Sequence, residues 1–340
     1  MCVNSAPPPI TTDIDAAASA LLRGQLVGIP TETVYGLAAR ADDDAAVQSI
    51  FRVKDRPAAS PLIVHVADLA MAHEWVVEIP DNAVELATAY WPGPLTMILP
   101  SNGRAAQTTV AGGSTVAIRV PDHPLTLDLI RAVGCGIAAP SANPHTRVSP
   151  TTAAHVASYF SRDEVALVLD GGPCSVGLES AIVDFSGTTP RILRSGSISA
   201  TAIGDVLQAP VPVDTRYLRR DELASMDIAS PGQSIVHYAP RARVVVADTI
   251  DALHANIDRA GATTTSGIIA AIPAAAARVQ FPDAHILLAT EDTSEFARQL
   301  YAALHAGDVM HVDTIHVLLP TSGAELSAIR DRITRASSAD

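Results

Sequence analysis

Apolar residues recur along the chain with two alternating periods, and this alternation is typical of an α/β protein. Residues 14–24 carry apolar side chains at helical spacing as far as Gly24, and residues 25–30 then form a continuous apolar run typical of a buried strand. The same alternation predicts helices over residues 42–53, 81–90, 123–134 and 151–160, and strands over 61–66, 95–100, 115–120, 136–140, 167–170, 180–185 and 191–194. The pattern therefore predicts an α/β domain over residues 13–209, preceded by a Pro-rich, disordered leader over residues 1–12.

The regular spacing of apolar residues is lost between residues 210 and 241, where turn signals such as Ser-Pro-Gly occur. This segment is predicted to be an interdomain linker. Alternation resumes with expected strands at 243–248, 267–273, 285–290 and 314–320, and expected helices at 250–260, 295–307 and 323–334. Strands and helices that alternate at this spacing favour a smaller domain with a mostly parallel sheet over residues 242–336.

Composition narrows the function classes. With 340 residues, of which 48% are hydrophobic, the chain is long enough for two cores. Aromatic residues make up only 4%, which argues against a protein that stacks nucleic-acid bases on its surface. The formal charge of −13 argues against nonspecific binding of polyphosphate backbones, although it leaves room for local positive patches.

Cysteine usage and the absence of targeting signals predict a cytoplasmic protein. Cys2, Cys135 and Cys174 are odd in number and lack metal-ligand spacing, so we expect reduced thiols in a reducing compartment. The chain contains no apolar run of about 18 residues, so the sequence predicts no membrane span. The first residues lack the basic start and apolar stretch of a secretory signal.

Lys54 is the only lysine in the chain, whereas the other 22 basic residues are arginines. Lysine presents a compact point charge, and arginine presents a flat fork. Lys54 could be a solvated cation at a helix end, where cations are favoured. However, Arg56 follows it directly before Pro57 and Pro61, in a stiff segment that leads into a buried strand, and such loops often carry ligand-binding groups.

Other polar residues stand at the ends of predicted strands. His65 lies among apolar neighbours and is either a satisfied core residue or a hydrogen-bond donor to a ligand. Ser149, before Pro150, is either a helix cap or a ligand contact. Arg119 and Arg194 could be surface residues, but the strand-end position is also where open α/β sheets bind ligands.

The order of the short motifs is more specific than any one of them. The chain contains PTETVYGL, KxRP with PLIVHV, TVAIRVP, APSAN with SPTT, GLES with VD, RILR and SPGxxxxHYAP, in this order. In these seven blocks, which span residues of about 15 to 245, it resembles the YrdC-type L-threonylcarbamoyladenylate synthases in their long form with an extra C-terminal domain. The region after the last motif matches that form only in its pattern of elements.

This resemblance implies a fold and a reaction. The first domain is expected to be a YrdC-like, twisted, open sheet with a concave, positively charged cavity, and the second a Rossmann-like unit. Enzymes of the family make threonylcarbamoyl-AMP and pyrophosphate from L-threonine, bicarbonate or CO₂, and ATP. The product serves the threonylcarbamoyladenosine modification of tRNA next to the anticodon. The implied partners are therefore these substrates and the proteins that take the adenylate to tRNA, with at most weak direct RNA contact.

The resemblance also implies roles for individual residues. Lys54, Arg56, Ser141 and Asn143 complete the KxR and SxN elements and are expected to be catalytic. The threonine moiety is expected to contact Thr33, His65, Arg119, Ala139 and Ser180. The nucleotide is expected to contact Arg56, Ser60, Thr115, Ser141, Ser149, Arg194 and Tyr238. No protein metal site is implied, because Mg²⁺ would arrive with ATP, and Lys54 would reach the phosphate oxygens.

In the family, the stretch that ends at Tyr238 folds over the nucleotide as a lid, although an irregular segment of this kind could also be a passive tether. The chain departs from the family at Ser60, where asparagine is frequent, and at Ala181, where threonine is usual. The segment between SPG and HYAP lacks the usual aromatic and basic residues, and SGSI replaces the more frequent Pro-Gly pair after RILR.

Three other interpretations remain. A hydrogenase-maturation carbamoyltransferase contains a related module, but its paired CxxC zinc motifs are missing from this chain. A double-stranded RNA-binding module is disfavoured by the overall acidity. An inactive interaction protein is disfavoured by the retained cations and hydroxyl groups.

Overall fold

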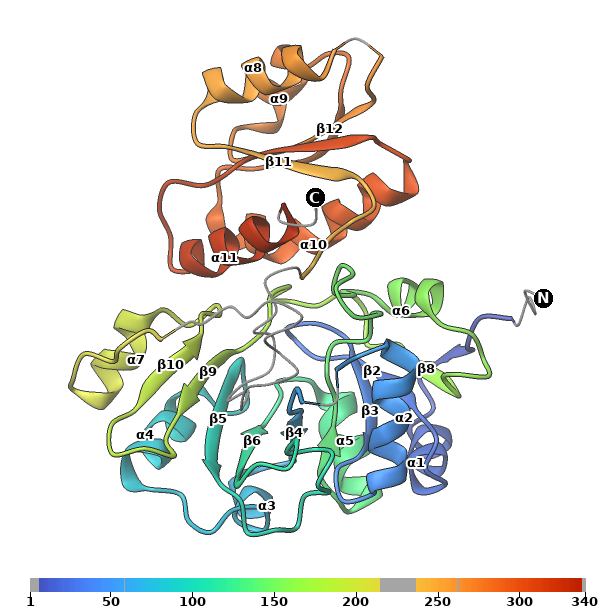
Figure 1. The fold of residues 1–340 in the computed structure, drawn as a ribbon, viewed down its shortest axis with the longest axis vertical. Helices are drawn as coiled ribbons and strands as arrows, with labels where there is room; N and C mark the ends of the chain where they lie inside the picture. Colours follow the sequence, from blue (N-terminus) through green and yellow to red (C-terminus); the bar gives the residue numbers. More distant parts are fainter. Residues whose placement is uncertain (1–5, 58, 215–236, 262, 338–340) are drawn as a thin grey trace.

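The computed structural model describes residues 6–57, 59–214, 237–261 and 263–337, which fold into two α/β domains (Figure 1). The strands are β1 (Ile10–Thr11), β2 (Val27–Ile29), β3 (Gly36–Arg40), β4 (Ile63–His65), β5 (Leu95–Pro100), β6 (Thr115–Arg119), β7 (Ile137–Ala138), β8 (Leu167–Leu169), β9 (Ala181–Asp184), β10 (Arg191–Arg194), β11 (Arg243–Ala247), β12 (Ser266–Ala270), β13 (His285–Ala289) and β14 (Thr314–Leu318). The helices are α1 (Ile14–Leu22), α2 (Asp44–Lys54), α3 (Leu69–His73), α4 (Asp81–Tyr90), α5 (Pro124–Val133), α6 (Ala153–Tyr159), α7 (Ala200–Leu207), α8 (Ile250–Ala260), α9 (Ala274–Gln280), α10 (Thr293–Val309) and α11 (Leu326–Ala336).

The first domain is built on a mixed, ten-stranded open sheet with the strand order β1-β8-β2-β3-β7-β4-β6-β5-β9-β10. Its central strands are buried on both faces, so their sequences are continuous apolar runs. Parallel pairing of β4 with β6 sets His65 directly opposite Arg119. The register therefore brings the ends of two strands, and two of the candidate residues, to one place.

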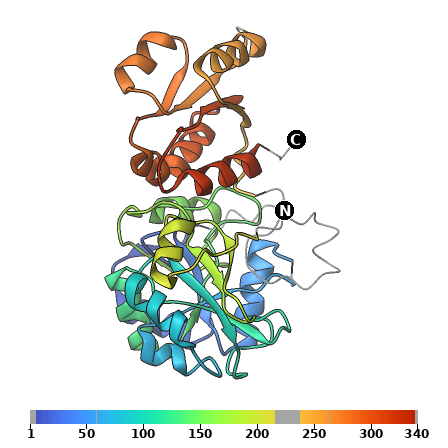
Figure 2. The ribbon, with the colours of Figure 1, turned by 90° about the vertical axis from the view of Figure 1, so that its left-hand side faces the viewer.

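The second domain has four parallel strands in the order β11-β14-β12-β13. Its helices form two layers: α10 and α11 face the first domain, whereas α8 and α9 cover the opposite face of the sheet (Figures 1 and 2). This arrangement confirms the prediction of a smaller Rossmann-like domain.

The structure corrects one expectation and adds one strand. The leader was expected to be disordered to residue 12, but Ile10–Thr11 form β1, which pairs in parallel with β8. The structure also contains a strand that the sequence pattern did not predict, β3, which begins at Gly36, is buried except at Arg40, and pairs with β2 and β7. The turn residues before Gly36 concealed that strand from a periodicity argument.

Most of the predicted linker and lid, residues 215–236, lies outside the described residues, so the lid stays a prediction; residues 210–214 and 237–241 of that segment are described. Across the part of the chain that the structure describes, no helix is both long enough and apolar enough to cross a bilayer. Cys135 and Cys174 are buried free thiols.

Candidate active site

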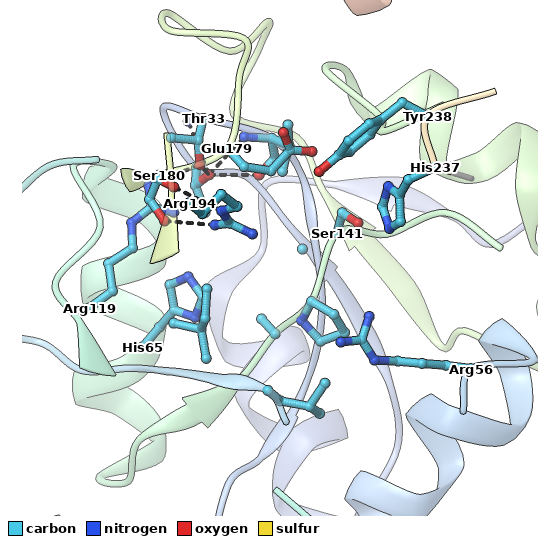
Figure 3. A pocket seen from close by; sticks show the side chains of 17 residues that line it. Thr33, Arg56, His65, Arg119, Ser141, Glu179, Ser180, Arg194, His237 and Tyr238 are labelled. Carbon is cyan, nitrogen blue, oxygen red and sulfur yellow. Dashed lines mark hydrogen bonds between the residues drawn. The ribbon is translucent and has the colours of Figure 1, made fainter. Parts of the chain in front are cut away.

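A pocket with a cavity volume of about 50 Å³, open to solvent, lies where the ends of β4 and β6 meet the loops after β2, β7 and the segment before β9. Figure 3 shows side chains that point into it from opposite walls, with Arg119, His65 and Ser180 facing Arg56, Ser141 and His237. The lining residues are Thr31, Thr33, Val34, Gly36, Arg56, Leu62, Ile63, His65, Arg119, Ala139, Pro140, Ser141, Glu179, Ser180, Arg194, His237 and Tyr238. Its lining of apolar side chains with a few converging polar and charged groups is typical of a ligand site.

All five residues expected at the threonine moiety line this pocket: Thr33, His65, Arg119, Ala139 and Ser180. Of those expected at the nucleotide, Arg56, Ser141, Arg194 and Tyr238 line it, whereas Ser60, Thr115 and Ser149 do not. Ser60 lies behind the wall and accepts a hydrogen bond from Arg56 Nη2 at 2.7 Å. Thr115 begins β6, at the opposite end of the strand from Arg119.

Arg119 is buried and already has partners. Its Nη2 lies 2.7 Å from Glu32 Oε1 and donates to Thr33 Oγ1 at 2.9 Å, while its Nε donates to the carbonyl oxygen of Gly93 at 3.2 Å. The Glu32 contact is an ion pair by distance, since neither carboxylate oxygen makes an aligned hydrogen bond. Glu32 thus balances the buried guanidinium while Arg119 still borders the pocket.

His65 stands beside Arg119 and is uncharged at neutral pH. Burial, together with the positive charge of Arg119, lowers the pKa of His65 to about 3. Its Nδ1 has no hydrogen-bond partner among the described residues. A neutral imidazole with an unused ring nitrogen, set in a pocket wall, can donate to or accept from a bound ligand.

Two arginines approach the pocket from opposite walls. Arg194 donates from Nε to the carbonyl oxygen of Ser180 at 3.0 Å and from Nη2 to Ser180 Oγ at 3.1 Å. Burial lowers the pKa of both Arg56 and Arg194 to about 10, and the proximity of Arg194 adds to the effect on Arg56. Two guanidinium groups that disfavour each other in this way would be stabilised by an anion between them.

Lys54 does not line the pocket. It ends α2, is 2% exposed, and its Nζ donates to the carbonyl oxygens of Ser141, at 2.5 Å, and Asn143. In this structure, the Lys54 ammonium group does not face the space expected for phosphate oxygens. Its hydrogen bonds instead hold the loop from Ser141 to Asn143 against the end of α2. Burial, and secondarily the charge of Arg56, lowers the pKa of Lys54 well below its usual value.

Asn143 and Ser149 also lie behind the pocket wall. The Asn143 side chain donates from Nδ2 to the carbonyl oxygens of Pro144 and Arg147 and so stabilises its own loop. Ser149 donates to Glu179 Oε1 at 2.7 Å. In the present geometry, these two residues position wall residues and do not present their side chains to a ligand.

Sequence reasoning missed Glu179 and His237 as lining residues, although both stand in the motifs GLES and HYAP. His237 is buried, and its pKa is lowered well below the usual value by burial and by Arg335, His145, Arg56 and Lys54. Glu179 is buried among hydrogen-bond donors from both domains. A carboxylate directly before a predicted ligand-binding serine was the available signal.

No group of three or more His, Cys, Asp or Glu side chains within the described residues could hold a metal ion. The one carboxylate in the pocket wall, Glu179, has both oxygens engaged by protein donors. Mg²⁺ that entered this site would therefore be held mainly by oxygens of the ligand and by water.

Family comparisons match both domains. Residues 19–196 match the family model described as "Telomere recombination", and residues 198–338 match the model for the C-terminal domain of threonylcarbamoyl-AMP synthase. The threonylcarbamoyl-AMP synthase of Schizosaccharomyces pombe is 33% identical over 98% of this chain and 90% of its own. The synthase of Pyrococcus abyssi is 40% identical over 69% of this chain and 68% of its own, and that of Bacillus subtilis is 43% identical over 68% and 66%.

The crystal structure of P. abyssi Sua5 complexed with L-threonine superimposes with a TM-score of 0.85 at 32% identity, covering 97% of each chain. The similarity thus extends through both domains and includes the pocket region. The chain belongs to the threonylcarbamoyl-AMP synthase family, in its long, two-domain form.

Proposed function

We propose that this pocket makes threonylcarbamoyl-AMP and pyrophosphate from L-threonine, bicarbonate or CO₂, and ATP. One observation carries the proposal: Arg119, His65 and Ser180 face Arg56 across a single pocket, and Arg194 enters the same pocket beside Ser180, in a chain of this family. A carboxylate-sized anion fits Arg119, and a polyphosphate fits between Arg56 and Arg194. The relatives named as synthases and the threonine-bound relative support the same assignment.

Arg119 and Thr33 are the groups that would bind threonine. The guanidinium can take the amino-acid carboxylate in a fork, and the Thr33 hydroxyl, already bonded to Arg119 at 2.9 Å, can turn toward the ligand. Ala139 borders the same space without a polar atom in its side chain. This combination would orient the amino group of threonine toward the centre of the pocket.

The reaction needs few covalent contributions from the protein. The deprotonated amine of threonine adds to CO₂ to give a carbamate, whose oxygen attacks the α-phosphorus of ATP as pyrophosphate leaves. Positioning and charge stabilisation dominate in such transfers. Arg56 and Arg194 would neutralise the phosphates, while Mg²⁺ that accompanies ATP would supply further charge stabilisation.

Pyrophosphate release, measured with threonine and bicarbonate added separately and together, tests the proposal. Release that requires both additions supports it, whereas release with ATP alone, or none at all, contradicts it. Arg194→Met is expected to lower the rate roughly a hundredfold, because one preorganised charged donor is typically worth that much. Arg191→Met is the matched control, since Arg191 lies on the same strand but pairs with Asp184 away from the pocket.

The product would pass to the proteins that modify tRNA beside the anticodon, and a cytoplasmic location would suit that role. The net charge of −13 favours transfer of the adenylate over strong direct RNA binding. Filter binding of tRNA with and without ATP distinguishes these possibilities, since tight binding that does not need ATP would favour an RNA-binding function.

A further inference from the structure

The second domain contributes two buried side chains to the back of the pocket wall. Arg332, on α11, is 1% exposed, and its Nε donates to Glu179 Oε2 at 2.9 Å. Its Nη2 donates to the carbonyl oxygen of Ser195, next to Arg194, at 3.0 Å. Tyr301, on α10, donates its hydroxyl to the same Glu179 oxygen at 2.9 Å. The Glu179 carboxylate is therefore held by one side chain of its own domain, Ser149, and by two side chains of the second domain.

The two domains are in close backbone contact beside Glu179, where the segment at Gly177 lies against α10. Gly177, two residues before Glu179, has φ +78°, and a Cβ there would lie 2.2 Å from the backbone oxygen of Arg298 on α10. Only glycine permits both that conformation and that approach. The segment that carries Glu179 is thus placed directly against α10, where Tyr301 is also located.

Arg332 also contacts the aromatic part of the wall. Its guanidinium carbon lies 5.3 Å from the centre of the Tyr238 ring, and Tyr301 stacks on the same ring with centroids 5.5 Å apart. Tyr238 lines the pocket at 1% exposure. Arg332 and Tyr301 thereby support two lining residues, Glu179 and Tyr238, from behind.

The charge of Glu179 makes this support consequential. Burial alone would raise its pKa, but Arg332, and after it Arg194, hold the pKa of Glu179 below its usual value. The carboxylate is consequently ionised in the wall of a pocket that is proposed to take a triphosphate. Among the described residues, the salt bridge to Glu179 comes from Arg332, which also pairs with Asp331, whereas no salt bridge joins Arg194 to a carboxylate.

We propose that Arg332 is a positioning residue of the synthase site, which neutralises Glu179 from the second domain and so leaves Arg194 free to bind the anionic nucleotide. The inference rests on the proposed function for the identity of the nucleotide. Without Arg332, the Glu179 carboxylate would turn toward Arg194 or repel the phosphates directly. Nucleotide affinity would fall, whereas the threonine end of the pocket, at Arg119, would keep its geometry.

The test compares Arg332→Met, Glu179→Gln and the double variant. ATP affinity is measured by calorimetry with Mg²⁺ present, and the KM values for ATP and threonine are measured from pyrophosphate release. Arg332→Met is expected to weaken ATP binding about tenfold or more, as loss of one partner of a buried charge pair does. The KM for threonine is expected to change less than about twofold. In the Glu179→Gln background, the same substitution is expected to cost less than about threefold, because the pocket wall then holds no carboxylate and the other partner of Arg332, Asp331, keeps its pair with Arg335.

Equal losses from Arg332→Met in both backgrounds, or an equal rise in the KM for threonine, would overturn the inference in favour of a purely structural role. Arg332→Lys keeps the charge and is expected to retain more ATP affinity than Arg332→Met, which leaves a test if the latter does not fold. Arg330→Met is the matched control on α11, since that side chain is 49% exposed. If the wild-type protein bound ATP but released no pyrophosphate, the proposed function would be refuted. The ATP affinities of the Arg332 and Glu179 variants would still decide whether Arg332 acts through Glu179.

Discussion

The two domains differ in where they bury charge. In the first domain, Glu32, Lys54, Arg119, Glu179 and Arg194 are all buried at or directly behind the pocket. In the second domain, the buried arginines of the described residues, Arg332 and Arg335, both lie on α11, which faces the first domain. The outer helices α8 and α9 bury only apolar side chains, Leu253 and Ala277.

This difference indicates that most of the buried charge follows the pocket and not the fold, with the exception of Asp184, which is buried and paired with Arg191 away from the pocket. Both domains are α/β units with aliphatic cores, and neither needs an ion in its interior for stability, because apolar replacements are often equally stable. Ions are retained where a ligand would use them or where another ion must be balanced. The inner face of the second domain, formed by α10 and α11, thus contributes charges that stabilise the site, whereas the outer face, formed by α8 and α9, does not.

Arg119→Met is expected to have the largest effect, because it leaves Glu32 buried without its cation. Removing one partner of a buried pair typically lowers the free energy of unfolding by about 3–5 kcal/mol. Denaturant unfolding measures this loss, and Glu32→Gln in the same chain is expected to restore part of it. Arg131→Met, which breaks an exposed pair with Asp128, is the control and is expected to change stability by less than about 1 kcal/mol. Similar losses at both arginines would contradict the comparison.

Lys54→Met is expected to have the next largest effect, since it leaves two buried carbonyl groups, of Ser141 and Asn143, without a donor. An unsatisfied buried acceptor costs about 1–3 kcal/mol. Pyrophosphate release is expected to fall roughly a hundredfold, because the loop that carries Ser141 loses its anchor. Arg52→Met, which removes an exposed cation from the same helix, is the control and is expected to keep the wild-type rate. A Lys54→Met variant with an unchanged rate would show that this anchor is unnecessary.

Lys54 also illustrates which features of the fold and of the site can be predicted from the sequence. Periodicity predicted most of the strands and helices and two α/β units, but not β1 or β3, because burial on one face imposes a spacing that is visible only in elements with a clear apolar pattern. Motif order selected the residues of the pocket region, but it could not separate Arg56, which lines the pocket, from Lys54, which holds the wall. That distinction depends on the loop 87 residues later in the chain. The contribution of Arg332, 153 residues from Glu179, was beyond any local pattern.

The interface between the domains is expected to weaken in acid. His155 on α6 and His305 on α10 stack with ring centroids 3.9 Å apart, beside Tyr159 and near Arg147. Burial lowers the pKa of His155 to about 3 and that of His305 to about 4, and each value lies below the ordinary 6.5. Below pH 6.5 the folded state therefore binds fewer protons than the unfolded state. The contribution of the histidine pair to the free energy of unfolding is complete above pH 6.5 and decreases as the pH falls below that value.

Between pH 7.5 and 5, the free energy of unfolding is expected to fall by on the order of 2 kcal/mol for each of the two rings. Urea unfolding at the two pH values measures it, and His305→Phe, which keeps a ring that cannot be protonated, is expected to reduce the loss. His73→Gln, at an exposed helix end, is the control and is expected to leave the pH dependence unchanged. A wild-type protein equally stable at both pH values would show that this histidine pair contributes nothing.

Thr249→Ala is expected to have the smallest effect, because it alters only the outer layer of the second domain. Thr249 caps α8 by accepting a hydrogen bond from the backbone nitrogen of Ala252 at 3.2 Å, and loss of such a cap costs about 1 kcal/mol. Thermal unfolding measures the loss, and Thr249→Ser, which keeps the hydroxyl, is expected to retain the stability. Pyrophosphate release is expected to stay at the wild-type rate in both variants. If Thr249→Ala weakened ATP binding as much as Arg332→Met, the outer layer would be coupled to the pocket as strongly as the inner one, and the distinction between the two faces of the second domain would fail.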